Sequence, residues 1–478
     1  MTLTEARRSV VVVGGGLAGI SAAIELAESG LPVTLIEARP WLGGATCSFV
    51  RRGLIIDNGQ HMFLRCHTAY REFLAKIGSV IGAPIQDRLD VPVLMASRQT
   101  RLRRSALPAP LHLVRAVASY RLLTIRQRAK VALVGASLLV GNVAAARGDD
   151  VSFGDWLGKL GQDESSRRLF WDLVGSAALN AAGDDANLGL ATTLIREAIL
   201  GGRDYADIGV PSTPLGALHG GPAADLLARL GAFVRLGVKV AAIQALPGGG
   251  YRLQLAGRDS SADQAAGREL PDAITADAVV LAVPAWEAAA LAPAQLSGPA
   301  ARWSMFEPSP IVSLHVLYGS RVTRLPFAAA VCETGMAWIV DKTNAAGNFG
   351  GQYLAVALPA AHEYVDMPSS RLRAEFLPWL EDLFPATADA DVEDFFVTRE
   401  RRATISQVPG TQRLRPDQPA GMPGFALAGA WIDTGWPDTM EGAVRSGLAG
   451  ADKVLYDLAA GARLAQAPAR PQVPALRR

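Results

Sequence analysis

The chain has 478 residues, half of them apolar, and a net charge of +2. This length exceeds what one hydrophobic core usually supports, so we expect two or more domains. The near-neutral charge and the lack of basic runs interleaved with aromatic residues exclude a nucleic-acid partner. The three cysteines form neither a metal-binding spacing nor a disulfide framework, which is typical of a reducing cytoplasm. An excess of arginine over lysine favours a bacterial source.

Residues 9–39 have the pattern strand, glycine turn, helix, strand. Gly14 permits a tight turn, Gly16 lets the backbone approach a pyrophosphate, and Gly19 lets the helix pack closely on the strand. The start of the helix would present free amides and its positive dipole end to the phosphates. Glu37 ends the second strand, where it can accept hydrogen bonds from a ribose. The stretch therefore predicts a dinucleotide-binding βαβ unit.

A second glycine pair, Gly43 and Gly44, follows so soon that it can wrap a cofactor longer than a nicotinamide dinucleotide. A short strand then ends in the polar turn Asp57–His61. Near the end of the chain, the segment from Phe425 reads as strand, turn and helix, and the helix is predicted to begin at about Thr439. The last residues, rich in alanine, proline and arginine, predict a disordered tail.

In chain order, these motifs resemble those of FAD-dependent amine oxidases and carotenoid-type desaturases. Asp57–His61 and the C-terminal Thr434–Ala443 are similar to the squalene-associated branch, which contains bacterial hydroxysqualene dehydroxylases. The resemblance covers nearly the whole chain. It implies an α/β fold: a Rossmann-type, GR2-like FAD-binding domain with an inserted α+β substrate domain that contains a mixed sheet and a helical lid.

The resemblance also implies that the chain alternates between the two domains and brings several separate segments to one FAD molecule. The expected FAD-binding segments are 1–62, 209–288 and 419–462, the expected substrate-domain segments are 63–208 and 289–418, and the expected tail is 463–478. The expected FAD contacts are Gly14, Gly15, Gly16, Leu17, Ala18, Gly19, Glu37, Ala38, Arg39, Gly43, Gly44, Ala45, Thr46, Asn58, Gly59, Gln60, Val240, Gly429, Trp431, Thr439, Met440, Glu441 and Ala443.

Two residues in the expected cofactor-binding segments depart from the family pattern. Ala45 stands where the family usually has an arginine, and Ala430 stands where it usually has an aspartate. Both lost side chains would have brought charge to the cofactor. Arg39 and Asp433 are the nearby groups that could compensate.

His61 is the main candidate for proton transfer, because the ordinary pKa of histidine lies near neutrality. The alternative is that His61 only hydrogen-bonds a backbone carbonyl. Asp433 is a second candidate acid, and Asp438 can instead cap the following helix. Three aromatic side chains could form an apolar wall: Trp41, Trp431 and Trp436.

The resemblance implies that the hydroxyl of hydroxysqualene is removed reductively to give squalene, a step of hopanoid biosynthesis. Protonation would help the hydroxyl leave as water, reduced FAD would deliver hydride from N5, and an external electron donor would reduce the FAD. A carotenoid-type (phytoene) desaturase is the first alternative. An amine oxidase fits less well, because Thr439 stands where those enzymes often have an aromatic residue. A prenyl-binding protein of the same fold without redox activity is the third.

Residues 106–147 combine an arginine-studded helix with the apolar run Val131–Ala146. The run is shorter than the roughly 20 residues needed to span a bilayer. Cationic side chains beside an apolar helix suit an interfacial position, and a buried helix pair over the substrate cavity is equally consistent. We expect a cytoplasmic protein that is peripheral on the inner face of the membrane.

The remaining chain predicts the inserted domain. Aromatic residues at 153, 156, 170 and 171 are expected mainly in its core. Residues 371–384 predict an amphipathic helix. Alternating apolar residues predict a strand at 311–318, and further strands are expected at 91–102, 337–340, 352–358 and 392–399.

Overall fold

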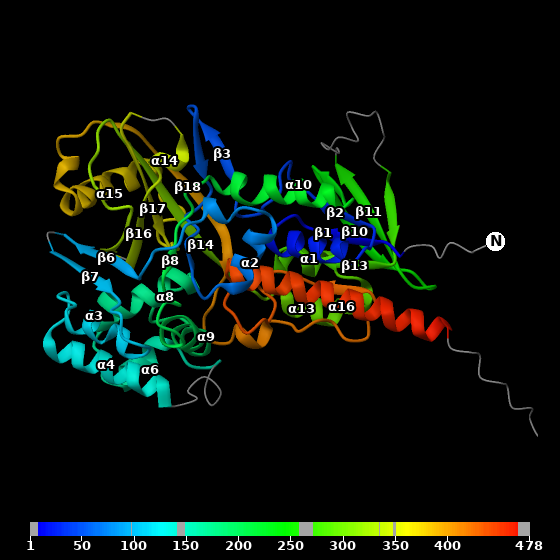
Figure 1. Ribbon diagram of the computed structural model, residues 1–478, viewed down its shortest axis with the longest axis horizontal. Helices are drawn as coiled ribbons and strands as arrows, with labels where there is room; N and C mark the ends of the chain where they lie inside the picture. The colour runs from blue at the N-terminus through cyan, green and yellow to red at the C-terminus, as the bar shows by residue number, and fades with distance from the viewer. Residues whose placement is uncertain are drawn as a thin grey trace, which may run out of the picture.

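The computed structural model describes residues 8–96, 98–140, 149–257, 271–333, 335–347 and 350–466. One half of the molecule is built on a parallel sheet with its helices, and the other half on a large mixed sheet with a group of short helices below it (Figure 1). The two halves confirm the expected α/β architecture with an inserted α+β domain.

The parallel sheet is assembled from three distant parts of the chain in the order β19-β13-β1-β2-β9. Its strands are short apolar runs, as expected for strands covered on both faces. Helix α1 (Leu17–Glu28), helix α10 (Gly221–Arg229) and the long helix α16 (Met440–Gln466) pack with it (Figure 1). The strands are β1 (Val10–Val13), β2 (Val33–Glu37), β9 (Phe233–Leu236), β13 (Ala278–Leu281) and β19 (Phe425–Leu427).

Alternate residues of β1 belong to two different cores. Val10 and Val12 lie in the core shared with α1 and α16, whereas Val11 and Val13 face a three-stranded antiparallel sheet. Helices α12 (Ala285–Leu291) and α13 (Ser297–Trp303) close this second core. The antiparallel strands are β10 (Val238–Ala245), β11 (Tyr251–Gly257) and β12 (Ala273–Ala276).

The large sheet has seven strands in the order β18-β14-β17-β16-β15-β6-β7. It is mixed because β15 pairs with β6 in parallel while its other pairs are antiparallel. Helix α15 (Ser369–Leu383) covers one face. The strands are β6 (Asp90–Met95), β7 (Arg98–Arg103), β14 (Pro308–Tyr318), β15 (Phe327–Cys332), β16 (Gly335–Asp341), β17 (Gln352–Leu358) and β18 (Val392–Ile405).

Short helices cover the other face of this sheet (Figure 1). The side chains at 153, 170 and 171 are buried in this core and Trp156 stacks on Phe153, which confirms their expected structural role. The helices are α3 (Val114–Ala118), α4 (Ile125–Val140), α6 (Phe153–Lys159), α7 (Glu164–Ser166), α8 (Asp172–Leu179) and α9 (Leu188–Leu194), with π-helical turns η3 (Arg167–Trp171) and η4 (Ile195–Leu200).

Smaller elements join the two halves. The hairpin of β3 (Ser48–Arg51) and β4 (Leu54–Asp57) packs on the large sheet, where Leu54 and Ile56 contact Tyr353. The remaining elements are β5 (Phe63–Leu64), β8 (Ile208–Gly209), α2 (Thr68–Lys76), α14 (Thr343–Ala346), the π-helical turn η5 (Gly216–Gly220), and the 3-10 turns η1 (Val80–Gly82), η2 (Leu111–Leu113), η6 (Ala294–Leu296), η7 (Pro385–Thr387) and η8 (Gln412–Leu414).

Three sequence expectations need correction or lie outside the described residues. The arginine-studded segment is two helices, α3 and α4, because the chain turns between residues 118 and 125. The apolar run is described only as far as residue 140. Helix α16 continues to Gln466, so residues 463–466 are helical and the tail boundary at 463 is too early; residues 467–478 are not described. Among the described helices, none has the length and apolarity to cross a membrane.

Candidate functional site

The spaced glycines of the turn between β1 and α1 have different surroundings. Gly14 has a φ of +107°, and a Cβ there would lie 2.2 Å from the carbonyl oxygen of Ala282. A Cβ on Gly19 would lie 1.9 Å from the carbonyl oxygen of Gly14. These two positions therefore need glycine for the packing of the protein itself.

Gly16 has no such requirement among the described residues. Its backbone conformation, φ −78° and ψ 179°, is open to any residue, and the nearest atom to an added Cβ is the Cα of Gly44 at 3.9 Å. The space lies at the start of α1, where the amides of Leu17, Ala18 and Gly19 have no partner within the helix. A cradle of free amides that a Cβ would fill suits the pyrophosphate of a dinucleotide.

Glu37 braces the glycine turn from the neighbouring strand. Its buried carboxylate accepts hydrogen bonds from the amides of Gly15, at 2.6 Å, and Arg39, at 2.8 Å. Each carboxylate oxygen has a further lone pair for a ribose hydroxyl. Ala38 is exposed beside it.

The second glycine loop packs directly on the first. The amide of Gly43 donates to the carbonyl of Gly15 at 2.8 Å, and a Cβ on Gly44 would lie 2.9 Å from the Cα of Gly16. The hydroxyl of Thr46 donates to the carbonyl of Gly43 at 2.7 Å and fixes the loop. The structure thus brings together the two loops that the sequence placed along one cofactor.

Arg39 approaches the position where the family arginine is missing. Its guanidinium donates to the carbonyl of Gly44 at 3.3 Å, next to the exposed Ala45. The side-chain nitrogen Nδ2 of Asn58 lies 3.5 Å from the carbonyl oxygen of Ala45 and 3.2 Å from the carboxylate of Glu400. Arg39 therefore brings positive charge to the same loop, as the sequence suggested.

The start of α16 offers a second set of free amides. Thr439 precedes the helix and its hydroxyl accepts from the amide of Gly442 at 3.2 Å, so it caps the helix. The amides of Met440 and Glu441 have no partner within the helix. These donors can stabilise negative charge on a bound ring.

Helices α1 and α16 follow strands of the same parallel sheet and cross closely. A Cβ on Gly447 would lie 2.2 Å from the carbonyl oxygen of Ala18. Because Gly447 is deeper in its helix than Ala18, the start of α16 extends beyond the start of α1 by roughly 10 Å at 1.5 Å per residue. The half-buried Ala443 lies on this projecting part. The two helix starts are therefore staggered, as an extended cofactor requires.

The side chain of Glu441 does not face the cofactor. It is fully buried, accepts from the amides of Ala69 (3.2 Å) and Tyr70 (2.8 Å) at the start of α2, and pairs with Arg445 at 2.7 Å. The hydroxyl of Tyr70 in turn lies 2.7 Å from Nε2 of His219 on η5. Glu441 therefore joins α16 to α2 and leaves its backbone amide for the cofactor.

The three tryptophans that were expected to form an apolar wall have different surroundings. The indole of Trp431 is buried, donates to the carbonyl of Val283 at 2.9 Å, and packs against Trp303. Gly429 has a φ of +144° and makes room for that indole. Trp436 is half-buried against His67, and Trp41 is 44 % exposed. The indole of Trp431 can lie buried in the core because its N–H donates to a backbone carbonyl.

The loop around Ala430 is supported by a buried arginine that the sequence did not indicate. Arg415 donates to the carbonyls of Ala430 (2.9 Å) and Ile432 (2.6 Å). Its burial lowers its pKa from the ordinary value for arginine. The loop that lacks the family aspartate therefore takes its shape from a cation bound to its carbonyls.

The two aspartates of this loop have different surroundings. Asp433 is exposed and accepts from the amide of Gly435 at 3.0 Å in a local turn. Asp438 does not cap α16, because its carboxylate accepts from the amide of Ile405 at 2.8 Å. Burial raises the pKa of Asp438 to about 6. Asp438 thus joins the flavin-side loop to the end of β18.

Asp57 lies at the centre of a buried polar cluster where the two halves meet. One carboxylate oxygen accepts from the hydroxyl of Ser48 (2.7 Å) and the amide of Leu215 (2.9 Å). The other lies 2.8 Å from Nζ of Lys342, which follows β16 of the large sheet. Lys342 also donates to the carbonyl of Pro211 at 3.4 Å. The cluster joins three separate segments of the chain, which are the β3–β4 hairpin, residues 211–215 and Lys342.

His61 lies close to this cluster and differs from the expected general acid. Burial lowers its pKa to about 4, with Lys342 acting in the same direction and Asp57 against it. Burial likewise lowers the pKa of His219 to about 3. At neutral pH the imidazole of His61 is uncharged, so it can donate or accept a hydrogen bond but holds no extra proton. The lowered pKa therefore favours a hydrogen-bonding role over proton donation, and proton transfer by His61 stays a prediction.

Three further residues expected to contact the cofactor, Gln60, Gly59 and Val240, lie in different surroundings. The side-chain nitrogen of Gln60 is buried and has no hydrogen-bond partner among the described residues. This donor fits a cofactor with carbonyl acceptors. Gly59 lies beside the ring of His61. Val240 is buried in β10 next to an irregularity in the strand pairing, in the same core as Ile36 of β2.

Lys342, Arg415 and His219 are the site residues that sequence reasoning missed. Each is a single polar residue whose partners are distant in the sequence. The one indication for Lys342 was a charged residue directly after a strongly apolar strand. No spacing rule links it to Asp57.

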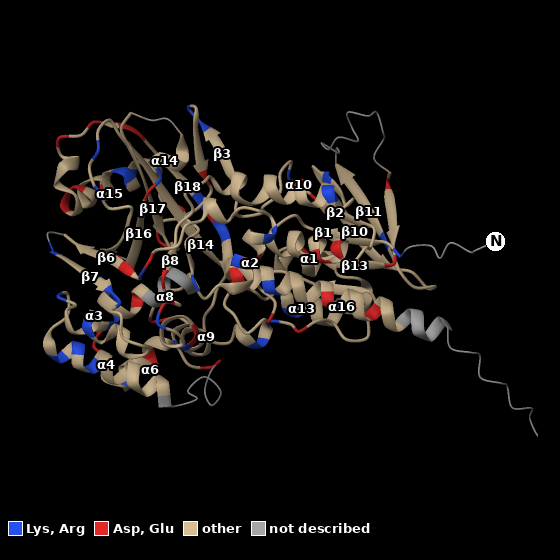
Figure 2. Cartoon of the chain, viewed as in Figure 1, with Lys and Arg blue, Asp and Glu red and all other residues tan. Residues whose placement is uncertain are grey.

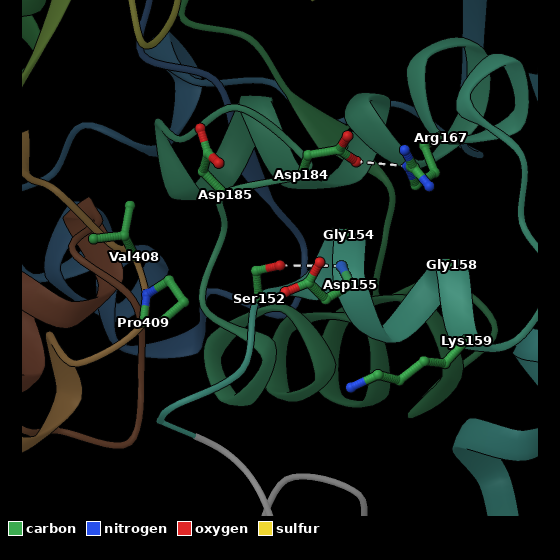
Figure 3. A pocket seen from close by; sticks show the side chains of 10 residues that line it. All are labelled: Ser152, Gly154, Asp155, Gly158, Lys159, Arg167, Asp184, Asp185, Val408 and Pro409. Atoms are coloured by element: carbon green, nitrogen blue, oxygen red, sulfur yellow. Dashed lines mark hydrogen bonds and ion pairs between the residues drawn. The ribbon is translucent and has the colours of Figure 1, made fainter.

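A separate hollow of about 750 Å³ lies beside α6 (Figure 3), in the half of the molecule that does not contain β1 and α1 (Figure 1). Three aspartates, at 155, 184 and 185, and two basic residues, Lys159 and Arg167, line it. Arg167 pairs with Asp184 at 2.7 Å. The charges are mixed, and none of the expected site residues lies in this hollow.

The family model for flavin-containing amine oxidoreductases matches residues 17–455. The chain is 31 % identical over 467 residues to the hydroxysqualene dehydroxylase of Rhodopseudomonas palustris, covering 94 % of this chain and 98 % of that protein. It is 30 % identical to the hydroxysqualene dehydroxylase of Sinorhizobium fredii, with 94 % and 99 % covered. The zeta-carotene desaturase of Zea mays is 25 % identical, with 92 % and 82 % covered.

Solved structures confirm the fold. Cyclohexylamine oxidase from Brevibacterium oxydans superposes with a TM-score of 0.69 at 19 % identity, over 95 % of this chain and all of that one. A redesigned putrescine oxidase gives 0.68 at 16 % identity, over 94 % and 99 %. The family model and the two hydroxysqualene dehydroxylases at 30 % identity or more show that the chain belongs to the flavin-containing amine oxidoreductase family, is similar to the hydroxysqualene dehydroxylases and is an FAD-dependent oxidoreductase, which agrees with the glycine cradle and the staggered helix starts.

Proposed function

We propose that this enzyme removes the hydroxyl of hydroxysqualene and forms squalene. The observation that carries the proposal is the match to two hydroxysqualene dehydroxylases over 94 % of the chain, at higher identity than to the zeta-carotene desaturase. The C–O bond breaks, the hydroxyl takes a proton and leaves as water, and a C–H bond forms at the same carbon. An external donor replaces the two electrons used in each turnover.

The bound cofactor supplies the chemistry, and the residues of the chain supply position and charge. Reduced FAD provides the hydride when it is bound. The amides at the start of α1 would hold the pyrophosphate of the cofactor, and those at the start of α16 would hold its flavin ring. Gln60 offers a free donor, and the uncharged His61 offers a hydrogen bond to the hydroxyl or to the water it becomes. We propose His61 as a residue that orients this group, and the exposed Asp433 stays a second candidate acid.

The decisive experiment is anaerobic incubation of the purified protein with chemically reduced FAD and hydroxysqualene, followed by product analysis. We expect squalene and stoichiometric oxidation of the flavin. A parallel reaction with oxidised FAD and a carotenoid precursor tests the alternative desaturase function, which the similarity to the zeta-carotene desaturase favours. Conjugated products that absorb visible light, with no squalene in the first reaction, would replace the dehydroxylase by a desaturase.

We also propose that the protein contacts a membrane through the outer side of α4 and the segment before it. Ile125, Leu133 and Leu139 are exposed at 81 %, 70 % and 45 %, and the alanines at 129, 132 and 136 between them are also exposed. This spacing of three and four residues puts an apolar stripe on the solvent side of the helix. Leu111 and Val114 add to it at 52 % and 58 % exposed.

Basic residues accompany this stripe. The exposed arginines at 115, 121 and 126 lie in α3, in the turn and at the start of α4, and several ribbon segments of these two helices carry the colour of basic residues (Figure 2). The opposite side of α4 is buried through Val131, Val134 and Leu138. An apolar stripe with arginines beside it suits the headgroup region of an anionic bilayer, from which a hydrocarbon substrate would be drawn.

A further inference from the structure

Lys342 reaches from the end of one domain's sheet into the cofactor side of the other. Its Nζ lies 2.8 Å from the carboxylate of Asp57, and the two side chains are only 6 % and 2 % exposed. Asp57 ends β4 and directly precedes the turn at 58–61. The ion pair therefore lies at the start of the segment that carries Gln60 and His61.

Both members of the ion pair make further hydrogen bonds. Asp57 has two further donors, Ser48 and the amide of Leu215, and Lys342 has one further acceptor, the carbonyl of Pro211. Ser48 also accepts from the amide of Gly216 at 2.9 Å, so the start of η5 is held at two points. Through these bonds the position of β16 fixes both η5 and the turn at 58–61.

Stability alone is a weak reason for such a pair. The desolvation of two buried charges offsets most of their attraction, and well-packed apolar residues often stabilise a fold equally well. A buried cation held at a defined place does, however, change the electrostatic potential around it, because the local dielectric constant is low. The location of Lys342 next to the turn thus points to a role in the site.

We propose that Lys342 is a positioning residue of the flavin site, which holds the turn at 58–61 through Asp57 and places a positive charge beside the reactive end of the cofactor. This inference rests on the proposed function only in that both need bound FAD. A fixed cation stabilises the reduced, more negative form of the flavin. It also opposes protonation of His61, whose facing groups are Asp57, Lys342 and His219.

The test compares Lys342→Met with Lys342→Arg in the holoenzyme. We expect Lys342→Met to bind reduced FAD about tenfold more weakly relative to oxidised FAD, which lowers the two-electron midpoint potential by about 30 mV. The titration of His61, followed by NMR, should move to higher pH, because Asp57 then acts unopposed. Lys342→Arg should keep both values near the wild type, since it keeps the charge.

Lys76→Met is the matched control. Lys76 pairs with Glu25 and Glu28 on the surface, and its side chain is 37 % exposed. Lys76→Met should change neither the midpoint potential of the flavin nor the titration of His61. If Lys342→Met does not fold, Lys342→Gln takes its place, because it keeps a hydrogen-bond donor for Asp57 but removes the positive charge, and the same lowered potential is expected.

A wild-type potential and an unchanged His61 titration in a folded Lys342→Met or Lys342→Gln variant would overturn the inference, even if the melting temperature fell. Both measurements need bound FAD and no substrate. A wild-type protein that binds FAD but makes no squalene would therefore refute the proposed reaction while leaving this test in place.

Discussion

Gly16 and Gly19 stand three residues apart in one turn, yet they are glycines for different physical reasons. At Gly19 the neighbouring backbone leaves no room for a Cβ, whereas at Gly16 the described protein leaves open space. The first constraint is part of folding. The second has meaning only when a phosphate group occupies the space beside the helix start.

Exchanging each glycine for alanine should separate these two constraints. We expect Gly16→Ala to keep the melting temperature of the apoprotein but to weaken FAD binding at least about tenfold, or ~1.4 kcal/mol. Gly19→Ala should lower the melting temperature even without FAD, because its Cβ meets a carbonyl oxygen at 1.9 Å. Calorimetry and flavin fluorescence titration measure the two effects. Unchanged FAD affinity in Gly16→Ala would rule out the pyrophosphate at this cradle.

His61 should make the stability of the protein depend on pH. Its pKa in the folded protein is about 4, below the ordinary 6.5, so the unfolded chain binds more protons between these values. The stability from neutral His61 is complete above pH 6.5 and is lost as the pH falls towards 4. The difference of about 2.5 units corresponds to roughly 3 kcal/mol.

The measurement is the melting temperature of the holoenzyme between pH 4 and 7 for wild type and His61→Gln. The variant should show a flatter profile over this range. His362→Gln, at an exposed position, is the control and should follow the wild type. Identical profiles for wild type and His61→Gln would show that His61 is protonated equally in both states.

At the scale of elements, the start of α16 has two partners at once. Its backbone amides face the cofactor side, while the side chain of Glu441 satisfies the first amides of α2. One helix end therefore positions another. The expected cofactor contact at 441 belongs to the backbone only, because the carboxylate is already used.

Glu441→Ala should destabilise the protein through α2. Two amides of α2 lose a charged acceptor and Arg445 loses its partner, so we expect a loss of about 2–4 kcal/mol in the free energy of unfolding. Hydrogen exchange of α2 should rise before that of the large sheet. Glu72→Ala, an exposed residue on the same helix, serves as the control. Unaltered exchange in α2 would mean that Glu441 does not hold the two helices together.

At the scale of the whole molecule, the two halves meet at the β3–β4 hairpin and the Asp57–Lys342 pair. The apolar stripe of α4 lies in the half that does not contain the parallel sheet (Figure 1). An enzyme that attaches by this stripe would keep its FAD-binding half in water and place its substrate-binding half on the bilayer.

Vesicle sedimentation tests this attachment. We expect the wild type to bind vesicles that contain an anionic phospholipid more tightly than neutral ones, and less tightly at high salt. The double variant Ile125→Glu/Leu133→Glu should bind at least about tenfold more weakly, because burial of each side chain contributes about 1.5–3 kcal/mol. Tyr456→Glu removes an apolar residue that is 74 % exposed on α16 and is the control.

Two results would contradict the membrane proposal. The first is equal binding of the wild type and the double variant. The second is a wild type that forms dimers which the double variant does not, since the stripe would then be a contact between two copies of the chain.

The sequence by itself determined the cofactor class and the order of the strands and helices that bind it. Glycine spacing, apolar runs and a terminal acid are local patterns, and each depends only on neighbours in the chain. Strands of the large sheet with a clear apolar pattern were predicted for the same reason. Strand β15 (Phe327–Cys332) was missed because it is a run of mostly small apolar residues without alternation.

Only the tertiary structure decided which polar groups meet. Asp57 and Lys342 are 285 residues apart and form a buried pair, Asp438 binds the end of β18 and not its own helix, and Trp431 turns into the core. Burial also lowers the pKa of His61 below the near-neutral value on which the sequence prediction rested. Long-range pairing and the dielectric surroundings of a side chain depend on the whole packed molecule, which no local spacing records.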